Sequence, residues 1–105
     1  MKDGKFEGVT GWESEPTTLK TAILRNGGKE LAVDFDFNGY KFTANLKQNE
    51  NGKFEGAFTR QNGGEKYIGS ASCKLFEDGA DIFLFGRWQE EGSTYTWWAE
   101  LQPLE

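Results

Sequence analysis

The sequence predicts an all-β fold in which eight antiparallel strands form an up-and-down meander closed into a small barrel. Turn signals recur at nearly even intervals, at Glu15-Pro16, Asn26-Gly27-Gly28, Asn38-Gly39, Asn51-Gly52, Asn62-Gly63-Gly64, Asp78-Gly79 and Glu91-Gly92. Between these signals apolar and polar residues largely alternate, as they do in strands with one buried face. Asn-Gly and Asp-Gly accept the positive φ angles of tight hairpins, so each strand is expected to pair with the next.

The expected strands follow the turn signals in order, and no segment offers a place for a helix. Their bounds are 5–13, 17–25, 29–37, 40–48, 53–61, 65–76, 80–90 and 93–102. A chain of 105 residues has the size of one domain, so residues 1–105 are taken as a single β-barrel domain. Closing the last strand onto the first removes the exposed edges that an open sheet would leave.

The hairpin around Asn38-Gly39 predicts a register that gives the sheet one apolar face. A two-residue turn there pairs Phe37 with Tyr40, Phe35 with Phe42, Val33 with Ala44 and Leu31 with Leu46. The opposite face of the same hairpin pairs charged and polar residues. This is the pattern of an antiparallel sheet with one wet side.

The later turns predict the remaining registers. Two-residue turns at Asp78-Gly79, Glu91-Gly92 and Asn62-Gly63 place Leu75 opposite Ile82, Trp88 opposite Tyr95 and Phe58 opposite Tyr67. Residues 50–52 fit better as a three-residue loop, in which Gly52 supplies a bulge. The face of the second strand stays open, because Leu19, Ala22, Ile23 and Leu24 support either choice.

One tripeptide and the strand layout carry a family resemblance. Gly86-Arg87-Trp88 is a Gly-x-Trp, and the first expected strand holds the adjacent pair Gly11-Trp12. In layout, nearly the whole chain resembles the calycin group of lipocalin-like and avidin-like barrels. Lipocalins carry their Gly-x-Trp on the first strand, so this chain departs from their pattern and no binding residue is transferred from them. The resemblance implies a closed barrel.

Alternating strand direction predicts two barrel ends of different chemistry. The inward residues of one end are purely apolar, and those of the other include all three tyrosines, two tryptophans and an arginine. Apolar rings with a few polar tips are typical of small-molecule pockets. The predicted ligand-binding residues are therefore Trp12, Phe37, Tyr40, Phe58, Arg60, Tyr67, Trp88, Tyr95 and Trp97. The alternative is that these rings fill the interior of a packed barrel.

Three aromatic residues of the last hairpin are expected to point away from the barrel. They are Phe83, Phe85 and Trp98, with Phe85 directly opposite Trp98. Three rings on one hairpin indicate a covered surface. A homodimer interface is the first interpretation, a platform for stacking sugars is the second, and a register that places the rings inside is the third.

The residue types needed for common catalytic and metal chemistry are scarce. Histidine is absent, which removes the commonest general base and the commonest zinc ligand. Residues 34–39 match the start of a calcium loop, but Asn45 stands where the closing glutamate belongs, so no metal and no cofactor is predicted. Cys73, the single cysteine, falls on an inward position and is expected to be a core residue rather than a nucleophile.

Charge and hydropathy exclude two classes of partner. The net charge is −5 and no cluster of lysine and arginine is visible, which argues against nucleic acid. No apolar stretch approaches the length of a membrane span or a signal peptide, so a cytoplasmic location without membrane contact is expected.

The sequence thus predicts a barrel that binds a small apolar or amphipathic ligand, with Arg60 pairing any anionic head group. The alternative function is a packed barrel that acts as a protein–protein interaction or homodimer module through the last hairpin. A small barrel enzyme is the third function considered, although no catalytic motif supports it.

Overall fold

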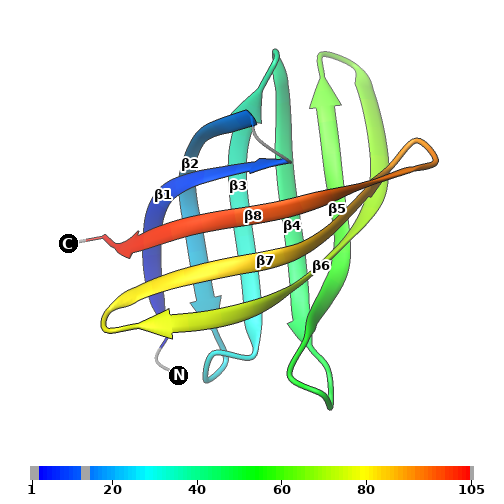
Figure 1. The fold of residues 1–105 in the computed structure, drawn as a ribbon. Helices are drawn as coiled ribbons and strands as arrows, with labels where there is room; N and C mark the ends of the chain where they lie inside the picture. The colour runs from blue at the N-terminus through cyan, green and yellow to red at the C-terminus, as the bar shows by residue number, and fades with distance from the viewer. Residues whose placement is uncertain (1–2, 13–14, 105) are drawn as a thin grey trace.

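The computed structural model describes residues 3–12 and 15–104, which form a closed β-barrel (Figure 1). Its strands are β1 (Gly4–Trp12), β2 (Glu15–Arg25), β3 (Glu30–Phe37), β4 (Tyr40–Gln48), β5 (Phe54–Asn62), β6 (Glu65–Asp78), β7 (Asp81–Glu90) and β8 (Ser93–Pro103). Each strand pairs antiparallel with its successor, and β8 pairs with β1. The predicted eight-stranded meander is confirmed, with strand bounds within two residues of those expected except that residue 13 lies outside the described residues.

Two hairpins and one loop have the predicted register. Phe37 pairs with Tyr40 across Asn38-Gly39, and Trp88 pairs with Tyr95 across Glu91-Gly92. Both central residues of these turns have positive φ, 52° and 81° in the first and 49° and 80° in the second. That pair of angles is the type I′ geometry that matches the twist of the flanking strands. The three-residue loop 50–52 also forms, and the Gly52 N–H donates to the Asn49 carbonyl over 3.0 Å.

The registers predicted for two other hairpins are wrong by two residues. Leu75 pairs with Leu84 rather than Ile82, and Tyr67 pairs with Arg60 rather than Phe58. The turn residues are Gly79-Ala80 and Gly63-Gly64, and in each turn only the first residue has positive φ, 63° in both. This is the type II′ pattern, which requires glycine at the first central position only. A shift of two residues keeps every side chain on its predicted face.

A bulge resolves the ambiguous face of β2. Leu19 pairs with Phe35, whereas Thr21 pairs with Asp34, so β2 carries one extra residue between them. The inward stripe therefore moves from odd to even positions, and Leu19, Ala22 and Leu24 are all buried. The turn expected at Glu15-Pro16 is wrong, because both residues are paired with β1 within β2.

The barrel interior is a single hydrophobic core built from all eight strands. At the apolar end, the side chains of Phe6, Leu31, Leu46, Phe54, Ile82 and Leu101 are buried, as predicted, and Leu75 is half-buried. Cys73 is fully buried among them. Burial raises the pKa of the Cys73 thiol from 9.0 to about 12, and the charge of Lys53 opposes this only weakly.

We expect Cys73 to react with thiol reagents only after unfolding, because both access and thiolate formation are suppressed in the barrel. The folded thiol keeps its proton between about pH 9 and 12, where the unfolded thiol loses it. The free energy of unfolding should therefore fall by up to about 1.4 kcal/mol per pH unit in this window. Urea titrations of the wild type and of Cys73→Ala check this, since the variant should lack this contribution. If the free energy of unfolding fell equally steeply with pH in the two proteins, the Cys73 thiol would have to ionise within the folded barrel.

Glycines allow neighbouring strands to approach closely where the barrel bends. The string GKFEG occurs at residues 4–8 and 52–56, and its phenylalanine points inward both times. A Cβ on Gly8 would lie 1.9 Å from the Glu100 carbonyl oxygen, and one on Gly56 would lie 2.1 Å from that of Asn45. The two copies thus meet the same steric requirement, which only glycine satisfies.

Candidate functional site

Most of the predicted ligand-binding rings meet in one cluster at the aromatic end of the barrel. Trp88 lies at its centre, stacked on Phe58 at 4.1 Å between ring centroids and 5.5 Å from Trp12. Trp97 approaches Trp88 from β8 at 5.3 Å, and Phe37 meets Trp12 at 5.0 Å. These spacings are those of favourable aromatic pairs.

The prediction missed two members of the cluster and included one residue that lies apart. Phe35 and Phe42 stack on each other at 5.2 Å and both contact Trp12. Their inward pairing was predicted, but their position nearer the barrel centre kept them off the expected site. Tyr95 is 38% exposed and contributes no ring contact within the described part of the chain.

The cluster has two layers. Phe35, Phe42, Phe58 and Trp88 are buried and form a floor, whereas Trp12, Phe37, Tyr40 and Tyr67 are only partly buried above it. We call these eight residues the aromatic bowl. The floor is filled by rings, so a ligand at this end would lie against the upper layer rather than deep in the barrel.

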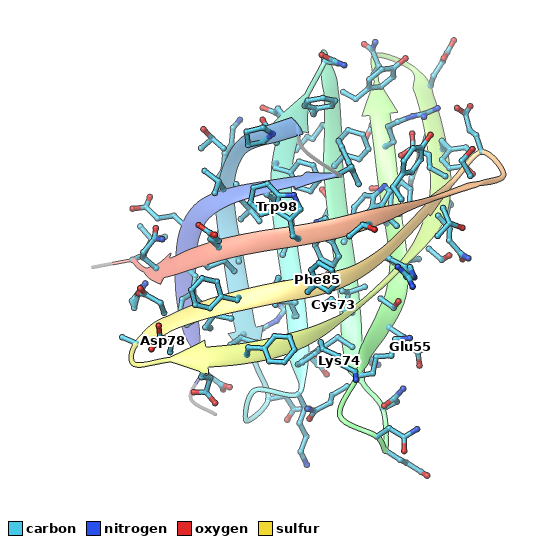
Figure 2. All side chains as sticks on the ribbon, viewed as in Figure 1. Glu55, Cys73, Lys74, Asp78, Phe85 and Trp98 are labelled. Atoms are coloured by element: carbon cyan, nitrogen blue, oxygen red, sulfur yellow. The ribbon has the colours of Figure 1, made fainter. Side chains whose placement is uncertain are left out.

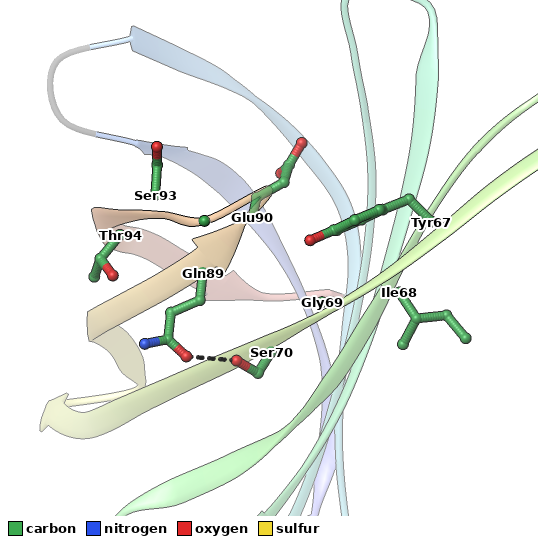
Figure 3. A pocket seen from close by; sticks show the side chains of 9 residues that line it. Tyr67, Ile68, Gly69, Ser70, Gln89, Glu90, Ser93 and Thr94 are labelled. Carbon is green, nitrogen blue, oxygen red and sulfur yellow. Dashed lines mark hydrogen bonds between the residues drawn. The ribbon is translucent and has the colours of Figure 1, made fainter.

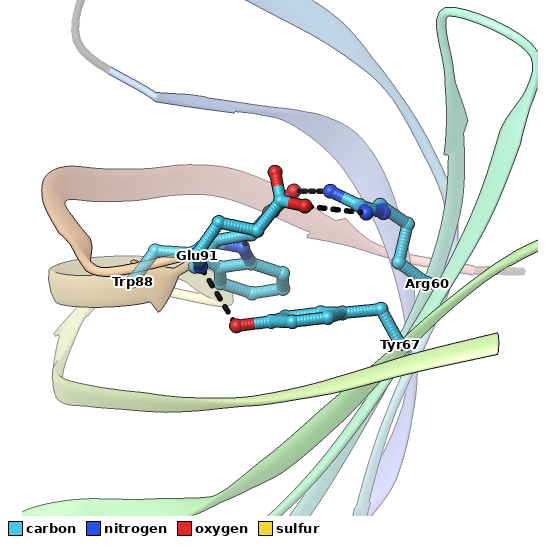
Figure 4. A network of polar contacts seen from close by, with 5 residues as sticks. Arg60, Tyr67, Trp88 and Glu91 are labelled. Carbon is cyan, nitrogen blue, oxygen red and sulfur yellow. Dashed lines mark hydrogen bonds and ion pairs between the residues drawn. The ribbon is translucent and has the colours of Figure 1, made fainter.

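Arg60 closes one side of the aromatic bowl. Its guanidinium lies over the rings of Tyr40 and Tyr67, 5.0 and 4.9 Å from their centroids. It also forms ion pairs with Glu90 and, at 3.4 Å, with Glu91 (Figure 4). The hydrogen bond to Glu91 is the largest influence that raises the pKa of Arg60; desolvation opposes it, and Glu90 adds to the increase.

Two further hydrogen bonds connect the β7–β8 turn to the aromatic bowl (Figure 4). The Glu91 N–H donates to the Tyr67 hydroxyl over 2.7 Å, and Trp88 Nε1 donates to Glu90 over 3.0 Å. Glu91 occupies a left-handed conformation that favours glycine or asparagine, with φ 49°. Its contacts with Arg60 and Tyr67 offset that conformational cost.

The two inward tryptophans of the β1–β8 seam differ in their polar contacts. Trp97 Nε1 donates to Thr10 Oγ1 over 2.8 Å, and the Thr10 hydroxyl donates to the Trp98 carbonyl over 2.8 Å. Among the described residues, 3–12 and 15–104, buried Trp12 Nε1 has no hydrogen-bond partner. An unpaired buried donor costs about 1–3 kcal/mol, so the Trp12 N–H is the one polar group of the aromatic bowl that an incoming acceptor would relieve.

A groove of about 460 Å³ opens beside the aromatic bowl, where β6 and β7 diverge (Figure 3). The β6–β7 ladder ends at Ser70 and Gln89, whose side chains hydrogen-bond over 2.7 Å. Beyond that pair, Tyr67, Ile68 and Gly69 of β6 line one side of the groove, and residues 89, 90 and 92–94 of the β7–β8 hairpin line the other. This groove was not predicted, because its position depends on where the paired strands β6 and β7 separate.

Three of the four aromatic residues on the outer face of β6, β7 and β8 are those of the expected interface, and of these Phe85 is exposed whereas Phe83 and Trp98 are half-buried. Phe85 pairs with Trp98 across β7 and β8, as expected (Figure 2). The fourth residue is Phe76 of β6, which pairs with Phe83 in the corrected register. Phe76 and Phe85 are 53% and 56% exposed. We call Phe76, Phe83, Phe85 and Trp98 the outer patch.

The residues of the calcium-like segment are engaged in cross-strand contacts. The Thr43 hydroxyl donates to Asp34 over 3.2 Å, and Lys20 pairs with Asp36. No group of three potential metal-ligating side chains occurs among residues 3–12 and 15–104. In the same described ranges, no helix has the length and apolarity needed to cross a membrane.

Comparison with known proteins adds no family assignment to this geometry. No protein-family model, curated protein or solved structure matches the chain. The likeness to calycins is therefore one of strand layout, that of a closed eight-stranded antiparallel barrel.

Proposed function

We propose that this protein binds a small apolar molecule carrying one neutral hydrogen-bond acceptor, and that the aromatic bowl is the binding site. The observation that carries the proposal is the buried Trp12 Nε1, which lies among aromatic rings and finds no acceptor in the described part of the chain. A carbonyl or hydroxyl oxygen would satisfy this donor, and the apolar body of the ligand would lie against the partly buried rings.

The charges around the aromatic bowl favour a neutral ligand. Arg60 was expected to pair with an anionic head group, but Glu90 and Glu91 already contact its guanidinium. The three side chains together carry a net charge of about −1 at neutral pH. A carboxylate ligand would have to displace one of the two glutamates, whereas an alcohol or ketone would not.

The bowl can admit a ligand by a small local movement. Trp12 Nε1 itself is buried, so an entering molecule must shift a neighbouring ring. Phe37 is the nearest candidate, because it is only partly buried, contacts Trp12 at 5.0 Å and ends β3 beside a tight turn. A change of the Phe37 rotamer would separate the two rings without any movement of the backbone.

The test compares the wild type with Trp12→Phe, which keeps a ring but removes the N–H. Calorimetric titrations would use matched probes, retinol against retinoic acid and decanol against decanoate. We expect the neutral member of a pair to bind the wild type, and Trp12→Phe to weaken that binding about tenfold. Trp98→Phe, on the outer surface, is the control and should leave the affinity unchanged.

Stability measurements separate this role from a structural one. Trp12→Phe removes an unpaired buried donor, which stabilises the protein, and part of the Trp12 ring volume, which destabilises it, so the ligand-free variant should be within about 1 kcal/mol of the wild type. A variant that loses both stability and binding would indicate that Trp12 only supports packing. If no neutral probe binds the wild type, the proposal is wrong.

A further inference from the structure

The outward side chains of β7 form a short sequence with opposite charges at its two ends. Asp81, Phe83, Phe85 and Arg87 alternate with the inward residues of the strand. Phe83 and Phe85 therefore lie between two charged residues. Asp81 is next to the β6–β7 turn, and Arg87 lies about 20 Å from it along the strand.

The neighbouring strand repeats this order of charges. On β6, Asp78 pairs with Asp81, Phe76 with Phe83, and Lys74 with Phe85. One end of the outer patch is therefore acidic and the other basic. None of these four charged side chains takes part in an ion pair within the described part of the chain.

We propose that two copies of this chain associate through the outer patch, with their β7 strands antiparallel across a two-fold axis between Phe83 and Phe85. In a two-fold symmetric contact, a residue pair that forms between the first copy and the second also forms between the second copy and the first. Phe83 of one copy then faces Phe85 of the other, and Asp81 faces Arg87 at both ends. Lys74 lies in the basic half of the outer patch with Arg87, and Asp78 lies in the acidic half with Asp81. Their charges therefore favour the same antiparallel orientation.

The charge order distinguishes a second copy from other occupants. A parallel arrangement of two copies would place like charges together, which is unfavourable. A flat sugar would use the rings but has no charge to match the acidic and basic ends. The surface is thus complementary to itself in one orientation only.

The size of the contact predicts a weak dimer. The strip is about 20 Å long and spans three strands that are about 5 Å apart, so it covers several hundred Å² per copy. A standard interface covers about 800 Å² per partner. We therefore expect a dissociation constant of about 10–100 µM.

Sedimentation velocity between about 1 and 500 µM measures this association in the unmodified chain. We expect reversible dimerisation by the wild type and a loss of at least tenfold in affinity for Phe85→Ser. Ile68→Ser is the matched control, because Ile68 is 63% exposed but lies outside the outer patch. Circular dichroism would establish that each variant keeps its β fold.

Charge reversal tests the orientation. D81R and R87D should each be monomeric over this range, because each places like charges opposite one another in both contacts. An equimolar mixture of D81R and R87D should dimerise again, since every contact then joins opposite charges. A mixture that stays monomeric overturns the antiparallel arrangement.

Two outcomes overturn the dimer itself. One is a wild type that stays monomeric at about 500 µM. The other is a monomer whose Phe85 and Trp98 NMR signals shift on addition of soluble oligosaccharides, which would assign the outer patch to a sugar. Neither outcome bears on the aromatic bowl, which lies inside the barrel.

Discussion

Replacing Gly86 by alanine is expected to destabilise the barrel by about 3 kcal/mol or more. Gly86 points inward on β7, between Cys73 of β6 and Trp97 of β8. An added Cβ would lie 1.9 Å from the Ser72 carbonyl oxygen and 2.5 Å from the Cys73 Cα. These are backbone atoms, so no rotamer change relieves the overlap and the β6–β7 ladder has to separate.

Urea unfolding of Gly86→Ala measures this loss of stability. If the loss exceeds the stability of the wild type, the variant will be unfolded and will lack the circular dichroism of a β-sheet. Gly64→Ala is the matched control, because a Cβ there meets no atom within 4 Å and Gly64 does not have positive φ. The control should stay within about 0.5 kcal/mol of the wild type. Equal stabilities for both variants would show that β6 and β7 lie further apart in solution.

Replacing Thr10 by valine is expected to cost about 2–4 kcal/mol, because it removes the hydroxyl that the buried Trp97 N–H and the partly buried Trp98 carbonyl both contact. The Thr10 hydroxyl accepts from Trp97 Nε1 and donates to the Trp98 carbonyl, each over 2.8 Å. Thr10 and Trp97 are both fully buried, so water cannot replace the hydrogen bond between them. Valine has the shape of threonine, and the change therefore removes hydrogen bonds without creating a cavity.

Thr10→Ser provides the comparison for this experiment. Serine keeps the hydroxyl and loses one methyl group, which should cost about 1 kcal/mol. Thermal and urea unfolding should therefore rank the proteins as wild type, Thr10→Ser and Thr10→Val in order of falling stability. If Thr10→Val proved the more stable variant, packing rather than hydrogen bonding would dominate at this position.

Features that depend on residues close together in the chain were predicted better than features that depend on packing between distant strands. At Asn38-Gly39 the predicted type I′ turn formed, and with it the predicted pairs. At Gly79-Ala80 and Gly63-Gly64 the sequence allowed a type I′ or a type II′ turn, and the choice depended on packing across whole strands. The bulge beside Leu19 was not predicted either, because both faces of β2 carry apolar residues and the alternation pattern alone cannot place an extra residue.

The candidate site shows the same division between local and long-range information. Alternation predicted which rings point inward, and Trp12, Phe58 and Trp88 do meet. It could not predict that Arg60 would be neutralised by Glu90 and Glu91, because that contact joins two hairpins. Phe76 was missed outside the barrel for a similar reason, since only the corrected register places it beside Phe83.

The closure of β1 onto β8 has a consequence for how this protein folds. Every other strand pairing joins neighbours in the chain, but the Thr10 bonds across the closure join residues 87 and 88 positions apart. Bringing such distant segments together carries the largest loop-closure entropy of the molecule. A curved sheet of seven hairpin contacts can therefore assemble first, and native-state hydrogen exchange should find the earliest opening at this single junction.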